Sequence, residues 1–272
     1  RYDNGRFYLN GRAVFQRRVL DPGFYPDGIY TAPTEDALIA DITMSQAVGF
    51  NGARLHEKIF EPLFLYHCDR LGYLVWGEYP NWGLDHSNPA SLYAMLPEWM
   101  EEMERDFNHP AIVGWCPFNE TWDYEDRRQD NNVLSTVYRV TRAIDPTRPC
   151  IDTSGNYHVI TDIYDVHDYD QDPASFRERY AKMLDERDVP DTSFVIASAR
   201  GARRQHWNGK APVFMSEYGG IQWAQGNGGW GYGTDAGSRS RALTHTRTSA
   251  ATSVGFAASC YLLGPSGSGK GP

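Results

Sequence analysis

The sequence of 272 residues contains no apolar run long enough to cross a membrane. A membrane-spanning helix needs about 20 mostly apolar residues, and no stretch approaches that length. Basic residues are also scarce, because 26 lysines and arginines stand against 35 acidic residues, for a net charge of −9. Without a cationic surface to neutralise phosphates, we expect neither a nucleic-acid partner nor an anionic membrane partner.

Cysteine is sparse as well, with 4 widely spaced residues and no Cys-x-x-Cys pair. This spacing indicates reduced thiols and not a metal site. His56, His109 and His167 also lack the close spacing of a His-x-x-x-His motif, so we expect neither a metal ion nor another cofactor. The unpaired thiols and the lack of a recognisable signal peptide favour a cytoplasmic location, although the chain begins at Arg1 and not at a methionine.

What the sequence does contain is the composition of a globular protein, with 41% hydrophobic and 22% charged residues. Its length suits one parallel α/β barrel, which needs about 250 residues. Aromatic residues reach 14%, including 8 tryptophans and 17 tyrosines. Such an excess can serve the core, or it can provide stacking surfaces for sugar rings.

Short apolar runs alternate with helical patterns along most of the chain. After a hairpin signalled by Asn10-Gly11, the strand-like runs are 15–20, 51–56, 73–76, 112–120, 150–153, 163–169 and 213–217. Helical patterns between them cover 34–48, 61–71, 92–107, 133–144 and 172–184. This alternation predicts crossover helices on a parallel sheet, closed as a (β/α)8 TIM barrel.

The C-terminal part fits that barrel less well. Residues 233–253 should hold the last crossover helix, but Leu243 is their one large aliphatic residue. Residues 255–263 can form an eighth strand. We therefore expect one catalytic domain over residues 1–264 with a degenerate last helix and strand, and a flexible tail or cloning remnant at 265–272.

Two buried strand patterns end in a glutamate, Glu120 and Glu217. Because the carboxyl ends of parallel barrel strands meet at one rim, we expect these carboxylates to face each other. Glycoside hydrolysis uses such a pair: one acid protonates the leaving oxygen, and the other attacks the sugar or activates water. Asn119 precedes Glu120 and could bind a sugar hydroxyl. Either glutamate alone could instead cap a helix or pair with an arginine.

The residues around both glutamates resemble known signatures. Phe118-Asn119-Glu120, after the run 108–115, resembles the acid/base signature of glycoside hydrolase family 2, and the run 214–220 resembles its nucleophile signature. Further similar stretches are 7–11, 49–56 and 65–78, and the resemblance covers about residues 6–232. It implies a retaining, exo-acting hydrolase of β-galactosides, β-glucuronides or β-mannosides, with Glu120 as acid/base and Glu217 as nucleophile.

The resemblance also assigns roles to neighbouring residues. Arg54 and His56 would form the floor of the site, where they orient Glu217 or bind sugar hydroxyls; for Arg54 the alternative is a buried ion pair that holds the barrel. His167 and Tyr169 end the predicted sixth strand, and we expect both to contact the substrate.

Tyr169 is the candidate for a hydrogen bond to the nucleophile, or else it anchors its loop. Trp122 and Trp223 follow strand ends, and we expect them to stack on sugar rings.

Two departures from the family pattern leave an alternative open. Family members carry β-sandwich domains before the barrel, and this sequence has none in that place. The last crossover and the eighth strand are also poorly formed. The alternative is a truncated or degenerate barrel that binds carbohydrate without turnover.

Overall fold

The computed structural model describes residues 2–3, 6–121, 128–155, 157–169, 172, 174–175, 178, 211–218 and 258–262. The chain begins with the small antiparallel sheet β1 (Tyr2–Asp3), β2 (Arg6–Leu9) and β3 (Arg12–Ala13). The turn between β2 and β3 places Asn10 at φ 49° and Gly11 at φ 78°. Both values lie in the left-handed region that a two-residue hairpin of this type requires, so the predicted Asn-Gly hairpin is confirmed.

A seven-stranded sheet forms the centre of the described structure. Its order is β7-β6-β5-β4-β10-β9-β8. The strands are β4 (Arg17–Asp21), β5 (Gly52–Leu55), β6 (Leu74–Glu78), β7 (Ile112–Cys116), β8 (Tyr164–Asp168), β9 (Val213–Tyr218) and β10 (Ala258–Leu262). Strands β4 to β7 run parallel to one another, and β8 runs parallel to β9. The predicted α/β class with a parallel sheet is thereby confirmed.

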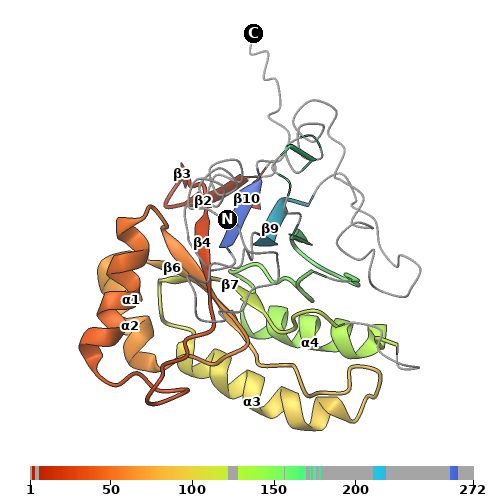
Figure 1. Cartoon of the computed structure of the whole chain (residues 1–272). Coiled ribbons are helices and arrows are strands. Elements are labelled where there is room, and N and C mark those ends of the chain that lie inside the picture. Colours follow the sequence, from red (N-terminus) through yellow and green to blue (C-terminus); the bar gives the residue numbers. More distant parts are fainter. Residues whose placement is uncertain are drawn as a thin grey trace.

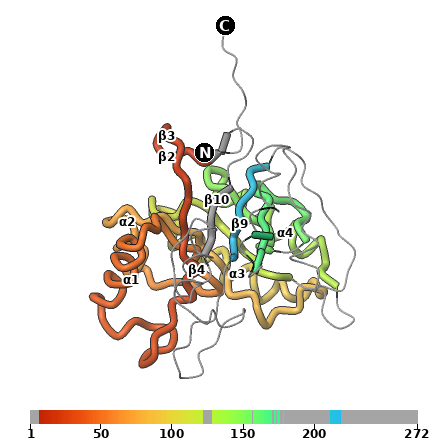
Figure 2. Tube along the Cα trace, turned by 45° about the horizontal axis from the view of Figure 1, so that its top comes forward, coloured from red at the N-terminus to blue at the C-terminus, as the bar shows by residue number. Residues whose placement is uncertain are grey.

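In the described part of the chain, four helices connect these strands and lie in an arc along the outer side of the sheet (Figure 1 and Figure 2). They are α1 (Glu35–Ala47), α2 (Pro62–Leu71), α3 (Ser91–Asp106) and α4 (Asn131–Ile144). The Thr34 side chain caps α1 by accepting a hydrogen bond from the backbone N–H of Ala37, which has no partner within the helix. Gly72 ends α2 in the left-handed conformation that glycine adopts without strain.

The described residues form a core on each face of the sheet. The larger part packs the helices on the strands and includes Leu38, Ile42, Phe64 and Trp99. The smaller part lies on the concave face, where the ring of Trp76 from β6 stacks on Phe214 from β9 at 5.8 Å. Three strands separate β6 from β9 in the sheet, so this contact requires the sheet to curl until distant strands face each other.

The closure of the sheet differs from the predicted barrel of eight parallel strands. Strand β10 does lie between β4 and β9, as an eighth strand should (Figure 1), but it runs antiparallel to both. A parallel return requires a crossover, usually a helix with an apolar stripe, and residues 233–253 offer almost no such stripe in sequence.

The predicted fifth strand at 150–153 is also reduced. In the described part of the chain it forms isolated bridges to the β7 side, at Cys150 and Ser154, and no ladder to β8. The sheet is therefore curled but not closed by regular ladders.

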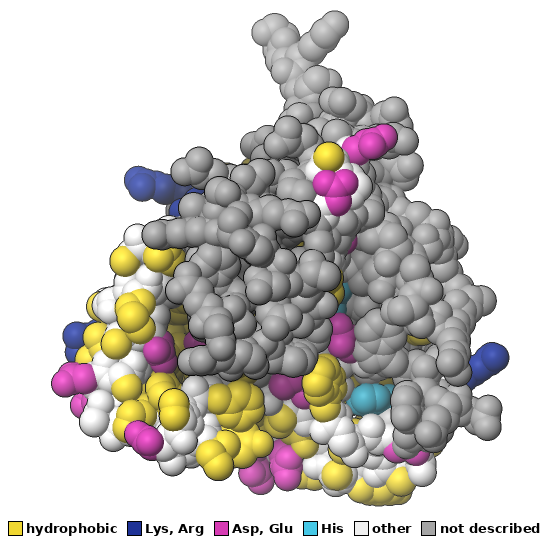
Figure 3. Space-filling view, in the orientation of Figure 1, with side chains coloured by type: hydrophobic (Ala, Val, Ile, Leu, Met, Phe, Trp, Pro, Cys, Tyr) yellow, Lys and Arg dark blue, Asp and Glu magenta, His cyan; other side chains and the backbone are white. Residues whose placement is uncertain are grey.

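Several predicted elements lie outside the described residues: the crossover at 233–253, the tail at 265–272, and the helix at 172–184 except for residues 172, 174–175 and 178. Among the described side chains, Cys68, Cys116 and Cys150 are buried free thiols, as predicted. None of the described helices has the length and apolarity that crossing a membrane demands. Acidic side chains outnumber basic ones on the described part of the face in Figure 3, in keeping with the net charge of −9.

Candidate active site

Glu120 and Glu217 reach the same rim of the sheet from different elements. Glu217 lies within β9, and Glu120 follows the end of β7 by four residues. Glu120 has φ 46°, a left-handed conformation that is uncommon for a residue with a side chain. Its backbone N–H donates to the carbonyl oxygen of Ser154 at 2.9 Å, which fixes this turn. Strain of this kind costs about 1–3 kcal/mol and is frequent at functional sites.

The two carboxylates lie close together. One oxygen of Glu120 and one of Glu217 are within 4.8 Å of each other, with a ring nitrogen of His167 inside the same limit. The side chain of Glu217 is 4% exposed, whereas that of Glu120 is 15% exposed. Glu217 is therefore the deeper group, and Glu120 is the one nearer to solvent.

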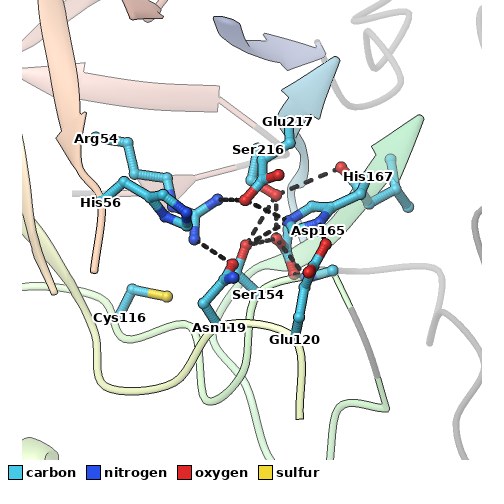
Figure 4. Close-up of polar contacts among 12 residues, drawn as sticks. Arg54, His56, Cys116, Asn119, Glu120, Ser154, Asp165, His167, Ser216 and Glu217 are labelled. Atoms are coloured by element: carbon cyan, nitrogen blue, oxygen red, sulfur yellow. Dashed lines mark hydrogen bonds and ion pairs between the residues drawn. The ribbon is translucent and has the colours of Figure 1, made fainter. Parts of the chain in front are cut away.

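The guanidinium of Arg54, from β5, contacts Glu217 and Asn119 (Figure 4). It also contacts Glu78. Its Nη1 donates to Oε1 of Glu217 at 2.8 Å, and its Nη2 donates to Oδ1 of Asn119 at 2.6 Å. Its Nε donates to Glu78. Burial alone would lower the pKa of Arg54, but the carboxylates of Glu78 and Glu217 raise that pKa well above its usual value. The guanidinium is thus a fixed positive charge.

Glu78 ends β6 and balances part of this charge. Burial would raise the pKa of Glu78, but Arg54 and His56 hold the pKa below its usual value. His56 lies at the end of β5 with its Nδ1 3.3 Å from Oε2 of Glu78. Arg54 therefore forms a buried ion pair with Glu78 and contacts Glu217 at the same time. The two roles expected for Arg54 are compatible with each other in this cluster.

Asn119 is held by its backbone and by its side-chain oxygen. The Asn81 side chain accepts from the N–H of Asn119 at 2.6 Å and donates to its carbonyl oxygen at 2.9 Å. The side-chain oxygen of Asn119 accepts from Arg54. Its buried Nδ2, by contrast, has no hydrogen-bond partner among the described residues. The amide group of Asn119 is thus held in place, while its two N–H donors have no partner among the described residues.

Tyr169 and His167 complete the surroundings of the carboxylates. The hydroxyl of Tyr169 donates to Oε2 of Glu217, so both oxygens of that carboxylate accept hydrogen bonds. His167 is 1% exposed, with Nδ1 2.8 Å from Oε1 of Glu120 and Nε2 3.4 Å from Oε1 of Glu217.

A second polar layer lies behind His167. Ser154 Oγ is 2.9 Å from Nε2 of His167 and donates to Oδ2 of Asp165 at 2.6 Å. Asp165 also accepts from Ser216, the neighbour of Glu217 in β9. His158 contacts Oδ1 of Asp165 at 2.9 Å. All these side chains are buried, so the layer forms a fully internal network.

The structure thus brings together seven of the predicted site residues: Arg54, His56, Asn119, Glu120, His167, Tyr169 and Glu217. The other two, Trp122 and Trp223, lie outside the described residues.

Sequence reasoning missed Glu78, Asn81, Ser154 and Asp165. Asp165 could have been found in the sequence, because it is a carboxylate in the middle of a predicted buried strand. Glu78 and Asn81 follow an apolar strand in the same way as Glu120.

Glu120, His167 and Glu217 also lie close enough together to hold a metal ion, with one ligand atom of each within 4.8 Å of the others. The hydrogen bonds that these three side chains already make disfavour a metal ion at this position. Arg54 and Tyr169 occupy the oxygens of Glu217, and His167 lies between the carboxylates as a donor. We interpret the group as an ion-paired cluster.

Comparison with known proteins places this site in context. The chain is 31% identical over 155 residues to a β-galactosidase from Psychromonas ingrahamii, covering 54% of this chain and 14% of that protein. It is 25% identical over 268 residues to "Beta-galactosidase 2" of Enterobacter cloacae, covering 86% of this chain and 25% of that protein. The chain thus spans a quarter or less of the length of these relatives.

Solved structures share the fold. A β-D-glucuronidase from Dictyoglomus thermophilum superposes with a TM-score of 0.68 at 18% identity, covering 92% of this chain and 43% of that one. This likeness concerns the fold alone. The family model described as "Glycosyl hydrolases family 2, TIM barrel domain" matches residues 4–231. Since that match includes both glutamates and most of the chain, the protein belongs to glycoside hydrolase family 2, through its TIM barrel domain.

Proposed function

We propose that this chain carries the catalytic site of a retaining β-glycoside hydrolase, with Glu217 as nucleophile and Glu120 as acid/base. The observation that carries the proposal is the separation of their carboxylate oxygens, within 4.8 Å. Retaining enzymes hold the two carboxyl groups about 5–5.5 Å apart, whereas inverting enzymes need about 6.5–9.5 Å to admit a water molecule. The short separation favours direct attack by one carboxylate.

The surroundings of the two glutamates support this division of roles. Glu217 is the deeper group, and Arg54 and Tyr169 orient both of its oxygens. A nucleophile benefits from such fixed geometry, because attack requires close alignment with the sugar carbon. Glu120 is more exposed, so it can meet a leaving group that departs towards solvent.

The reaction would proceed by two displacements. Glu120 gives its proton to the glycosidic oxygen while Glu217 forms a bond to the sugar carbon, and the aglycone leaves as an alcohol. Glu120, now a carboxylate, removes a proton from water. That water attacks the same carbon and releases Glu217. Two inversions leave the β configuration unchanged.

The side-chain amide of Asn119 supports a role for this residue in sugar binding. Its buried Nδ2 has no partner among the described residues, and an unsatisfied buried donor costs about 1–3 kcal/mol. A hydroxyl group of the sugar, next to the reacting carbon, would remove that cost. Such contacts strengthen in the transition state of glycoside hydrolysis.

The substrate would be a β-linked galactoside, glucuronide or mannoside cut from the chain end. The exo mode and the sugar classes are implied by the family resemblance. Because the chain spans a quarter or less of the β-galactosidases compared above, β-sandwich domains and a closed eight-stranded barrel are proposed for the whole protein.

A panel of chromogenic β-glycosides tests the proposal. The chain should release the chromophore from one of the three sugar classes, and NMR of the first product should show the β anomer. Formation of the α anomer would contradict the retaining mechanism.

Azide rescue then separates the two carboxylates. In Glu217→Ala, azide should restore turnover by attacking from the vacated face, and the product should be the α-glycosyl azide. In Glu120→Ala, azide should attack the glycosyl-enzyme and give the β-glycosyl azide, and substrates with acidic leaving groups should be spared. The opposite pairing would mean that the roles are reversed.

A second candidate function is carbohydrate binding without turnover. The antiparallel β10 and the reduced fifth strand favour it, because both alter the rim from which barrel enzymes build their sites. Failure to hydrolyse any glycoside of the panel, together with calorimetric binding of the free sugar, would support this function.

A further inference from the structure

His167 occupies a distinctive place between the two carboxylates. Its Nδ1 is 2.8 Å from Oε1 of Glu120, and its Nε2 is 3.4 Å from Oε1 of Glu217. One imidazole thus touches both groups. His167 is 1% exposed, and both of its ring nitrogens face protein oxygens.

The partners of His167 determine where its protons lie. Glu217 is ionised and favours an N–H on the ring nitrogen that faces it. Oε1 of Glu120 accepts from Nδ1 while the proton that Glu120 donates in catalysis is held on its other oxygen. Ser154 lies 2.9 Å from Nε2, but its one hydroxyl hydrogen has acceptors in Asp165 and Ser216, so its oxygen can accept from His167. These partners favour a hydrogen on both ring nitrogens, and we therefore expect His167 to be an imidazolium.

The backbone is shaped to receive this ring. Gly155 has φ 73°, and a Cβ added to it would lie 2.2 Å from Cε1 and from Nδ1 of His167. Real atoms never approach that closely, so the ring packs flat against the bare Cα of Gly155. Glycine is required here both for the backbone conformation and for the space.

Asp165 anchors the ring from behind through Ser154. Asp165 accepts from Ser154, Ser216 and the N–H of Gly155, at 2.6 Å for Ser154 and 3.1 Å for Gly155. His158 bridges Asp165 to Asp152, with Nδ1 2.7 Å from Oδ1 of Asp152. Positive and negative groups thus alternate from Asp152 to the catalytic pair.

We propose that His167 is a positioning residue: its imidazolium, held by Gly155 and the Asp165 network, fixes the carboxyl group of Glu120 at working distance from Glu217. This inference rests on the proposed function for the roles of the two glutamates. His167 acts through Glu120 and does not touch the sugar. Its role is to keep the acid aimed at the glycosidic oxygen.

The charged and titratable groups that face His167 agree with this role. Burial would lower the pKa of His167, but Glu217 and Glu120 raise it. Arg54 opposes them weakly from β5, Asp165 lies behind Ser154, and the ring of Tyr169 is 6.5 Å away.

Leaving-group dependence tests the proposal. His167→Phe keeps a ring without donors, whereas His167→Asn keeps a neutral N–H donor near the position of Nδ1. When the carboxyl group of Glu120 is misplaced, kcat/KM falls most for substrates whose leaving group must be protonated. For His167→Phe, kcat/KM should therefore fall up to about 100-fold more with a phenyl glycoside than with a dinitrophenyl glycoside. His167→Asn should recover part of the difference.

His109→Asn is the matched control. His109 also pairs through Nδ1 with a carboxylate, Asp69, at 2.6 Å, but it lies at the opposite end of β7. This variant should lose stability without any change in leaving-group dependence. An equal loss with both glycosides in His167→Phe would show a general structural role and overturn the proposal.

NMR of ¹⁵N-labelled histidine gives a readout that needs no turnover. Both ring nitrogens of His167 should be protonated at pH 7, and Glu217→Gln should lower the pH at which the ring loses its charge. A neutral His167 ring at pH 7 in the wild type would overturn the inference. If the wild type hydrolyses no glycoside of the panel, the proposed function fails, while this NMR result still decides the state of His167.

Discussion

Nη1 of Arg54 lies 2.8 Å from Oε1 of Glu217, although 163 positions separate the two residues in sequence. The same guanidinium binds Glu78, so one cation lies between two buried carboxylates from different strands. Removing one charge from such a cluster leaves the others without compensation. Arg54 should therefore matter for folding and for turnover, and the two effects can be separated.

Arg54→Met should lower the free energy of unfolding by about 3–5 kcal/mol, because it leaves Glu78 and Glu217 buried without their counter-charge. Turnover should fall to background. The double variant Arg54→Met/Glu78→Gln should regain part of the stability but none of the activity. Urea unfolding and glycoside assays measure the two effects, and recovery of activity in the double variant would contradict the role of Arg54 in orienting Glu217.

Asn119→Ala should lower kcat/KM about 100-fold on the best glycoside, since it removes a donor used in the transition state. On the matching 2-deoxy glycoside the variant and the wild type should differ far less, because that substrate lacks the hydroxyl. Steady-state kinetics on both substrates test this. Equal losses on the two would show that Nδ2 of Asn119 serves the structure and not the sugar.

Gly155→Ala should destabilise the protein more than Gly72→Ala does. The two glycines have φ 73° and 65°, so the backbone strain is similar. A Cβ at Gly72 meets nothing within 4 Å, whereas one at Gly155 would overlap the ring of His167. Gly72→Ala should cost about 1 kcal/mol, and the additional loss in Gly155→Ala, measured by urea unfolding, isolates the packing of His167. Equal losses would disprove the close contact.

Asp165 should make stability depend on pH in the acid range. Burial would raise its pKa, but the hydrogen bond and charge of His158 and the charge of His167 bring it to about 2, from 3.8. A depressed carboxylate pKa stabilises the fold above about pH 4, and this contribution is lost as pH falls towards 2. Asp165→Asn should thus be less stable than wild type by on the order of 2 kcal/mol at pH 7.

That deficit should shrink as the pH falls from 4 towards 2. Urea unfolding at several pH values measures it, with Asp130→Asn, at the N-cap of α4, as a control. A deficit that stays constant down to pH 2 would contradict the assigned charge of Asp165.

The sequence by itself determined the elements and the two glutamates. Alternation of apolar runs with helical patterns located β4 to β9 and four helices, because hydrophobic periodicity reflects which face of each element is buried. Local signals such as Asn10-Gly11, Thr34 and Gly72 fixed the turn, the cap and the helix end through backbone geometry alone. Strand-end position singled out Glu120 and Glu217.

The tertiary structure decided the rest. The direction of β10 depends on long-range pairing with β4 and β9, which local pattern does not encode. The position of His167 between the glutamates likewise depends on Gly155, which precedes β8, and on Glu120 and Glu217, which come from other parts of the chain. Its role as an internal cation emerges only when those groups meet, because charge and hydrogen bonding are set by neighbours in space and not in sequence.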